Sequence, residues 1–155
     1  MNEREVVKAR ANRRYQASAE AVRAVIVDQP GHAMWFPGMR RVEALPAEAD
    51  GVPIWRHEFT ATKLRIEVID RGDESHAPIE WRVSDERGYF EATWRFEFMR
   101  ESGDACTVVM EETRRVHGLV ARLWAWAFVT PEHFVNKYLD ALEHAVPSRR
   151  GVAVA

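Results

Sequence analysis

The spacing of apolar residues changes once along this chain of 155 residues, close to Gly118, and that change constrains the fold more than any other feature. Between Met39 and His117, apolar and polar residues alternate in short segments, which indicates strands with one buried face. Turn-forming residues separate these segments at hairpin-sized intervals, so we expect an antiparallel meander. The predicted strands are 40–45, 54–60, 64–68, 79–84, 90–98 and 106–110. Beyond Gly118, apolar residues recur every three or four positions, as on one face of a helix.

The N-terminal part predicts a strand followed by two short helices. Residues 5–14 alternate in the same way as the later strands. Ser18 precedes a run of good helix formers, which is typical of a helix N-cap. That helix must end before Pro30 and Gly31, since neither residue continues a regular helix. A short turn or second helix, 32–36, is expected next.

The C-terminal part predicts one long helix. Thr130 followed by Pro131 is typical of a helix start, with proline at the first helical position. The helix is expected to reach about Val146, and residues 147–155 are expected to form a disordered tail. No internal repeat or linker interrupts the chain. We therefore predict a single domain over residues 1–155, with its core at about 5–146.

Composition excludes several classes of protein. Apolar residues make up 46% and charged residues 30%, as in a globular domain. A formal net charge of −2 argues against a nucleic-acid-binding surface. The single cysteine, Cys106, forms neither an internal disulfide nor a thiolate metal cluster. The N-terminal ten residues are charged where a signal peptide is apolar, and no apolar run is long enough to span a membrane, so we expect a cytoplasmic protein. Arginine supplies 19 of the 22 basic residues, which indicates a GC-rich bacterial genome.

Three segments and the order of the elements carry a family resemblance. They are residues 15–22 (YQASAEAV), with Asp28 shortly after them, 35–42 (WFPGMRRV) and 134–143 (FVNKYLDALE). With the order strand, helix pair, six-strand meander and long helix, the chain resembles the helix-grip fold of the START-related (SRPBCC) superfamily. That superfamily includes birch-pollen-type allergens and the polyketide cyclase/dehydrase and lipid-transport families. The resemblance implies an α+β fold, in which a curved antiparallel sheet of about seven strands wraps around the C-terminal helix and two short helices follow the first strand.

The resemblance also implies a class of function. Members of the superfamily hold lipids, polyketides, hormones or other hydrophobic molecules in a cavity between sheet and helix, so we expect a lipid, isoprenoid or polyketide ligand here. One alternative is a polyketide aromatase/cyclase that uses His57, Glu112, Arg114 or Tyr138 for proton transfer in the same cavity. A second alternative is a protein-interaction or co-chaperone module, which would have a filled core and an exposed patch. The fold by itself does not choose among them.

One phase of the predicted strands points toward the C-terminal helix and supplies the candidate ligand-binding residues. They are Trp55, His57, Phe59, Trp81, Phe90, Trp94, Phe96, Met110, Glu112 and Arg114, with Tyr138 from the helix. For any one of the aromatic residues taken alone, a place in the core is the better explanation. Together, planar side chains on a curled sheet make good walls for an aromatic or lipidic ligand.

The polar members of this set are the most informative. His57 lies between two inward aromatic residues, and it is either a ligand contact or a buried histidine hydrogen-bonded to a backbone carbonyl. Glu112 and Arg114 continue the inward row of Met110 and are predicted to line a polar end of the cavity together with His57. The alternative is that the strand has left the sheet by then, so that both charges are solvated.

Motifs of known chemistry are missing. The sequence contains no nucleophile elbow, P-loop, dinucleotide-binding glycine motif or zinc-protease motif. The histidines are not clustered, so we predict neither a metal site nor a cofactor. Trp124, Trp126 and Phe128 are spaced too closely for one helical face. They predict a cap over the core, a cavity mouth, an oligomer interface or a transient contact with a membrane surface. The chain is expected to be a monomer or a homodimer.

Overall fold

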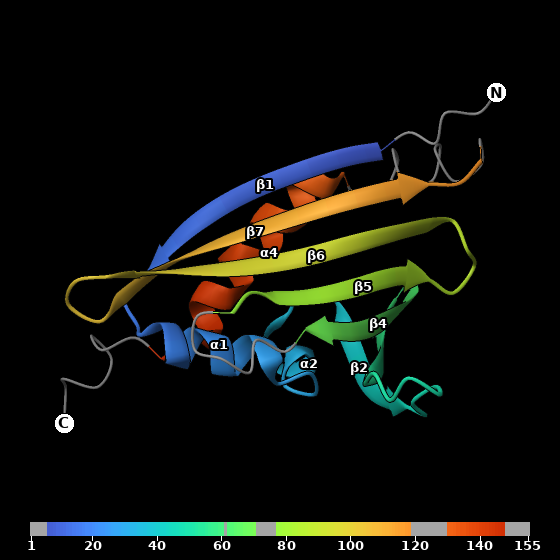
Figure 1. The fold of residues 1–155 in the computed structure, drawn as a ribbon, viewed down its shortest axis with the longest axis horizontal. Coiled ribbons are helices and arrows are strands. Elements are labelled where there is room, and N and C mark those ends of the chain that lie inside the picture. Colours follow the sequence, from blue (N-terminus) through green and yellow to red (C-terminus); the bar gives the residue numbers. More distant parts are fainter. Residues whose placement is uncertain (1–5, 61, 71–76, 119–129, 148–155) are drawn as a thin grey trace.

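The computed structural model describes residues 6–60, 62–70, 77–118 and 130–147. Within them, seven strands form one antiparallel sheet and helices lie against one of its faces (Figure 1). The strands are β1 (Val6–Tyr15), β2 (Met39–Leu45), β3 (Ile54–Phe59), β4 (Lys63–Asp70), β5 (Ile79–Asp85), β6 (Phe90–Glu101) and β7 (Ala105–Val116). The helices are α1 (Ala19–Val27), α2 (His32–Trp35) and α4 (Pro131–Ala145).

The sheet has the order β1-β7-β6-β5-β4-β3-β2. Strands β2 to β7 form the predicted meander, and β1 pairs with β7 along its whole length, from Val6 opposite Arg115 to Tyr15 opposite Cys106. The register shifts once in β2 and once in β4, and such irregularities increase local twist and help a sheet to curl. The predicted α+β architecture, a curved antiparallel sheet with two short helices after its first strand and one long helix, is confirmed.

The helices begin where the sequence predicts. The Ser18 hydroxyl accepts a hydrogen bond from the Ala21 N–H at 3.1 Å, which caps α1. The Thr130 hydroxyl does the same for the His133 N–H at 3.2 Å, and Pro131 occupies the first turn of α4. Both caps satisfy N–H groups that have no partner inside the helix.

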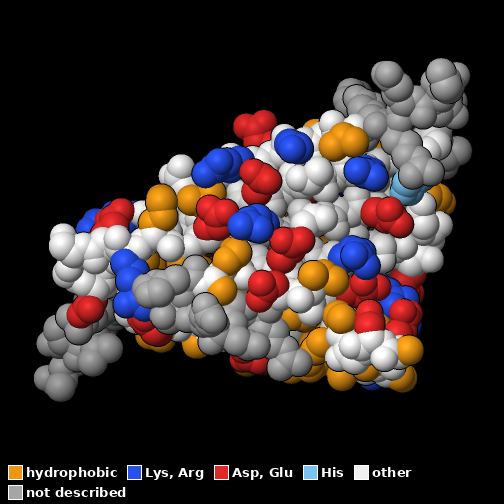
Figure 2. Space-filling model, viewed as in Figure 1, with side chains coloured by type: hydrophobic (Ala, Val, Ile, Leu, Met, Phe, Trp, Pro, Cys, Tyr) orange, Lys and Arg blue, Asp and Glu red, His pale blue; other side chains and the backbone are white. Residues whose placement is uncertain are grey.

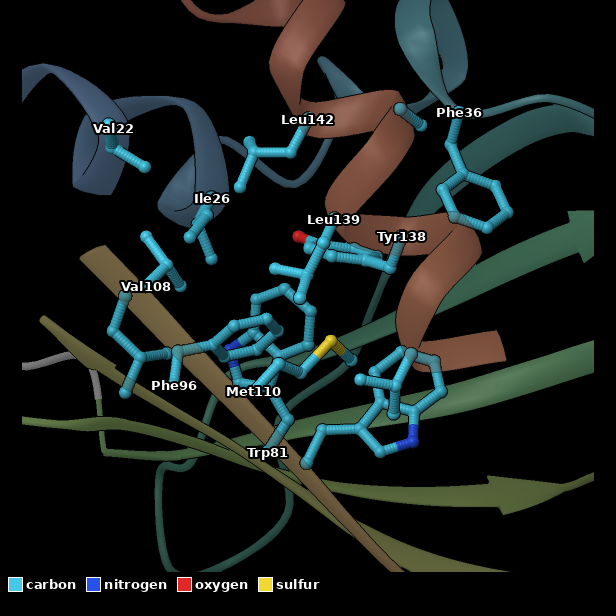
Figure 3. Close-up of a cluster of buried hydrophobic side chains, with 14 of the residues drawn as sticks. Val22, Ile26, Phe36, Trp81, Phe96, Val108, Met110, Tyr138, Leu139 and Leu142 are labelled. Atoms are coloured by element: carbon cyan, nitrogen blue, oxygen red, sulfur yellow. The ribbon is translucent and has the colours of Figure 1, made fainter. Parts of the chain in front are cut away.

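The core lies between the concave face of the sheet and the helices. In Figure 1, α4 runs behind β1, β7 and β6, with α1 and α2 beside it. Figure 3 shows side chains from α1 and α4 meeting those of the strands. The contributing residues are Val22 and Ile26 of α1, Tyr138, Leu139 and Leu142 of α4, and Trp81, Phe96, Val108 and Met110 of the sheet. This shared burial is the main source of stability for both layers.

The outer face of the sheet carries interleaved acidic and basic side chains (Figure 2). Ion pairs cross between neighbouring strands, for example Arg95 with Glu80 at 3.3 Å and Arg82 with Glu67 at 3.1 Å. The two faces therefore match the alternation in the sequence. None of the helices in the described ranges is long and apolar enough to cross a membrane.

Candidate functional site

The predicted site residues lie on the concave face of the sheet and on α4. Nine of the eleven are buried, and Trp55 and Phe59 are half-buried against the core. The structure divides them into an aromatic middle and two polar clusters, which differ in hydrogen bonding and in charge.

The aromatic middle joins the central strands to α4. The Trp81 ring on β5 lies 5.1 Å from the Phe96 ring and 6.1 Å from the Trp94 ring, between centroids. The Phe96 ring in turn lies 5.3 Å from the Tyr138 ring. These tilted and edge-to-face geometries are the favourable ones for aromatic pairs. They form a continuous aromatic surface under the helix.

One polar cluster, which we call the histidine cluster, consists of Gln29, His32, His57 and Tyr138. His32 Nδ1 lies 2.9 Å from the Asp28 carbonyl oxygen. A carbonyl only accepts, so Nδ1 carries the proton and Nε2 accepts from the Tyr138 hydroxyl at 2.9 Å. His57 Nε2 donates to Gln29 Oε1 at 2.8 Å. The cluster links the α1–α2 region to β3 and α4 through directed hydrogen bonds.

Both histidines of this cluster are neutral at pH 7. Burial lowers the pKa of His32 to about 4, although its bonds to the carbonyls of Asp28 and Gln29 oppose that shift. Burial, together with a smaller effect of the nearby His32, lowers the pKa of His57 to about 3. The two rings lie 5.4 Å apart between centroids. Removing a charged imidazole from water is the dominant cost in each case.

Sequence reasoning identified His57 and Tyr138 but missed the other two members. His32 is a lone histidine in a four-residue helix, and its partner Tyr138 lies 106 positions along the chain. Gln29 stands in the segment that ends α1, where a polar residue is expected in any case. No local pattern marks either residue as buried, so only the tertiary fold identifies them.

The second polar cluster is a buried ion pair on β7. Arg114 Nε donates to Glu112 Oε1 at 2.8 Å, and Arg114 Nη2 lies 2.7 Å from the same oxygen. The Glu112 side chain is 0% exposed and that of Arg114 is 8% exposed. The Arg114 guanidinium also lies 5.1 Å from the centre of the Phe90 ring. Because β7 stays paired with both neighbours beyond these residues, the alternative of a solvated strand end is wrong.

This ion pair leaves two polar atoms incompletely bonded. Glu112 Oε2 and Trp94 Nε1 are buried and have no hydrogen-bond partner. Burial raises the pKa of Glu112, while Arg114 and the nearby Trp94 indole lower it. The Trp94 indole therefore acts on the carboxylate as a weak hydrogen-bond donor, in a geometry that leaves Nε1 and Oε2 without a well-formed hydrogen bond. Buried polar atoms in this state are uncommon in native proteins and ask for an explanation.

Comparisons with known proteins bear on the fold. No protein-family model and no curated protein sequence matches this chain. Solved structures do match. A START superfamily protein from Mycobacterium smegmatis has a TM-score of 0.68 at 17% identity, covering 90% of this chain and 96% of that one. The Zhui aromatase/cyclase from Streptomyces sp. R1128 has a TM-score of 0.73 at 16% identity, covering 97% and 98%. Norcoclaurine synthase from Thalictrum flavum has a TM-score of 0.70 at 14% identity, covering 94% and 96%.

The fold is the helix-grip fold that these solved structures share. The resemblance that the sequence suggests is confirmed at the level of the fold. The prediction that His57, Glu112 and Arg114 line one polar end of a cavity is wrong in one respect, because these residues belong to two separate clusters. His57 lies on β3 and Glu112 on β7, with three strands between them in the sheet.

Other features of the helix-grip domain are less informative about chemistry. Described residues form a pocket of about 330 Å³ at the ends of β3 and β5 and another of about 470 Å³ beside α4. Neither pocket lies between the sheet and the helix, so the ligand cavity expected there stays a prediction. The described residues include no group of three or more metal-ligating side chains. Burial raises the pKa of Cys106 to about 11, which leaves an unreactive thiol. Trp124, Trp126 and Phe128 lie outside the described residues.

Proposed function

We propose that this protein binds a hydrophobic small molecule against the concave face of its sheet, at the end formed by Phe90, Trp94, Glu112 and Arg114. A lipid, an isoprenoid or a polyketide has the required character. The similarity of the fold to that of a START superfamily protein and of an aromatase/cyclase supports this class of ligand.

The observation that carries the proposal is that two polar atoms beside the buried ion pair lack hydrogen-bond partners, although aromatic rings surround them. Trp94 Nε1 and Glu112 Oε2 are both buried without a partner. Leaving such a group unpaired costs about 1–3 kcal/mol. A purely structural core gains nothing from this arrangement. An apolar ligand with one polar group would recover part of the cost, since binding sites combine apolar walls with a few placed polar groups.

Titration with a neutral apolar fluorophore, N-phenyl-1-naphthylamine, tests the proposal. We expect saturable binding with quenching of the tryptophan emission. Trp94→Phe should weaken binding because it changes the proposed wall, while the matched Trp35→Phe on α2 should leave it unchanged. Circular dichroism confirms that both variants are folded. Absence of saturable binding, or equal weakening by the two variants, would show that the concave face at Trp94 is not the site.

A second candidate function is cyclisation of a polyketide in the same place, and the raised pKa of Glu112 favours it. Aldol closure of a poly-β-ketone requires a base to take a proton from the carbon between two carbonyls and an acid to protonate the oxygen of the carbonyl that is attacked. The carbanion attacks the second carbonyl carbon, and this new carbon–carbon bond closes the ring; elimination of the resulting hydroxyl with a neighbouring proton, as water, then forms the double bond. A buried carboxylate with a raised pKa suits both proton transfers.

Mass spectrometry of a short synthetic β-polyketone after incubation tests this second function. We expect a cyclised product that has lost one water, formed faster than in buffer. Glu112→Gln should remove this acceleration, with circular dichroism confirming that the variant is folded. A wild-type rate equal to the spontaneous rate would leave binding alone as the function.

A further inference from the structure

The two unpartnered atoms belong to residues that lie directly opposite each other on neighbouring strands. Trp94 on β6 is the direct partner of Glu112 on β7 in the register of the sheet. Side chains that are directly opposite on one face lie about 5 Å apart at their Cβ atoms. An indole N–H donor and a carboxylate acceptor are therefore presented together at one place on the concave face.

The charge at this place is already balanced. Arg114 directs both its Nε and its Nη2 at Glu112 Oε1, so its positive charge compensates that of the carboxylate. Oε2 of the same carboxylate is left as an acceptor, and Trp94 Nε1 is left as a donor. A group that completes both bonds must accept one hydrogen bond and donate another without adding charge.

We propose that the ligand of this site carries a neutral hydroxyl group, which accepts a hydrogen bond from Trp94 Nε1 and donates one to Glu112 Oε2. This inference rests on the proposed function and names its ligand class, a hydroxylated apolar molecule. A hydroxyl supplies one donor and two acceptor positions on a single oxygen atom, so one group on the ligand satisfies both partners.

Other polar groups satisfy only half of the site. A carboxylate or a ketone accepts from the indole but leaves Oε2 without a donor, and a carboxylate adds a second negative charge beside Glu112. An ammonium group donates to Oε2 but leaves the indole N–H without an acceptor. A buried group that stays unpaired keeps its full desolvation cost. The arrangement thus discriminates against charged ligands and against simple ketones.

The surroundings favour an aromatic hydroxyl, that is, a phenol. The Phe134 ring stacks on the Trp94 indole at 4.8 Å between centroids, with an angle of 29°. The indole N–H lies in the ring plane, so this stacking covers a face of the indole and leaves the N–H direction to another group. Phe134 is only half-buried, at the first turn of α4, so its displacement opens the indole face to a ligand ring.

Four bicyclic compounds of similar size test the inference: naphthalene, 2-naphthol, 2-acetylnaphthalene and 2-naphthoate. Their affinities are measured by quenching of tryptophan fluorescence at pH 7, with calorimetry as a second method. We expect 2-naphthol to bind at least about tenfold more tightly than naphthalene, in line with a hydrogen bond to a charged group. We expect 2-acetylnaphthalene and 2-naphthoate to bind more weakly than 2-naphthol.

Two variants test whether Trp94 and Glu112 cause the preference for 2-naphthol. Trp94→Phe removes the donor and should reduce the ratio of naphthol to naphthalene affinity to threefold or less, while Trp35→Phe should keep the wild-type ratio. Glu112→Gln removes the negative charge beside the proposed hydroxyl position, so it should improve binding of 2-naphthoate relative to wild type. A ratio measured within one variant is insensitive to a partial loss of folded protein.

The outcomes separate the two proposals. If none of the four compounds binds, the proposed function is wrong. If naphthalene and 2-naphthol bind equally, apolar binding stands and the hydroxyl inference is wrong. A ketone or carboxylate that binds more tightly than 2-naphthol, or a naphthol preference that survives Trp94→Phe unchanged, also overturns the inference.

Discussion

The Glu112 carboxylate is fully buried, and Arg114 compensates its charge. Because removing two charges from water is costly, such a pair adds little net stability, but losing one partner strands the other. Arg114→Met should therefore destabilise the protein by about 3–5 kcal/mol. The double variant Glu112→Met with Arg114→Met should recover most of that loss. Urea unfolding measures both, and a double variant as unstable as the single one would contradict this account.

The histidine cluster makes stability depend on pH. His32 and His57 have folded pKa values of about 4 and about 3, below the 6.5 expected in the unfolded chain. Between these values the unfolded state binds more protons, so stability is complete above about pH 6.5 and falls as the pH drops. We expect a loss on the order of 2 kcal/mol per histidine between pH 6.5 and pH 5.

Urea midpoints at several pH values check this dependence. His57→Gln should make the profile shallower, since one of the two titrating groups is gone. His133→Gln, which replaces an exposed histidine on α4, should leave the profile unchanged. An equally steep profile in His57→Gln would mean that other groups cause the pH dependence.

At the scale of single elements, the start of α4 rests on Thr130. Its hydroxyl accepts from the His133 N–H, which would otherwise have no partner. Thr130→Ala should cost about 1 kcal/mol, whereas Thr130→Ser keeps the oxygen and should cost little. Both are measured by thermal or urea unfolding. Equal losses in the two variants would indicate that the methyl group, not the cap, stabilises this end of the helix.

The elements themselves were predictable because their signals are local. The alternation through Phe90, Trp94 and Phe96 identifies the inward face of β6, and Thr130-Pro131 identifies the start of α4. The polar clusters were predictable only in part. The inward phase of Glu112 and Arg114 is visible in the sequence, but their mutual pairing depends on side-chain geometry. The bond between His32 and Tyr138 depends on how α2 meets α4, which no local pattern encodes.

At the scale of the whole molecule, the two faces of the sheet contribute unequally. The concave face excludes water under the helices, while the outer face carries exposed ion pairs between strands. Burial of apolar area is worth about 25 cal/mol per Å². Exposed ion pairs are worth less than about 1 kcal/mol each, because water and salt screen them. We therefore expect almost all of the sheet's stability to come from its concave side.

Trp81 and Arg82 test this asymmetry, since they are neighbours on β5 that point to opposite faces. Trp81 is 1% exposed, and Arg82 pairs with Glu67 on the outer face with 63% of its side chain exposed. Trp81→Ala should destabilise the protein by about 3–5 kcal/mol, and Arg82→Ala by less than about 1 kcal/mol. Trp81→Phe gives a milder measurement if the alanine variant does not fold. Urea unfolding in low and high salt compares them, and an Arg82→Ala loss that matches the Trp81→Phe loss would show that the outer ion pairs hold the sheet together.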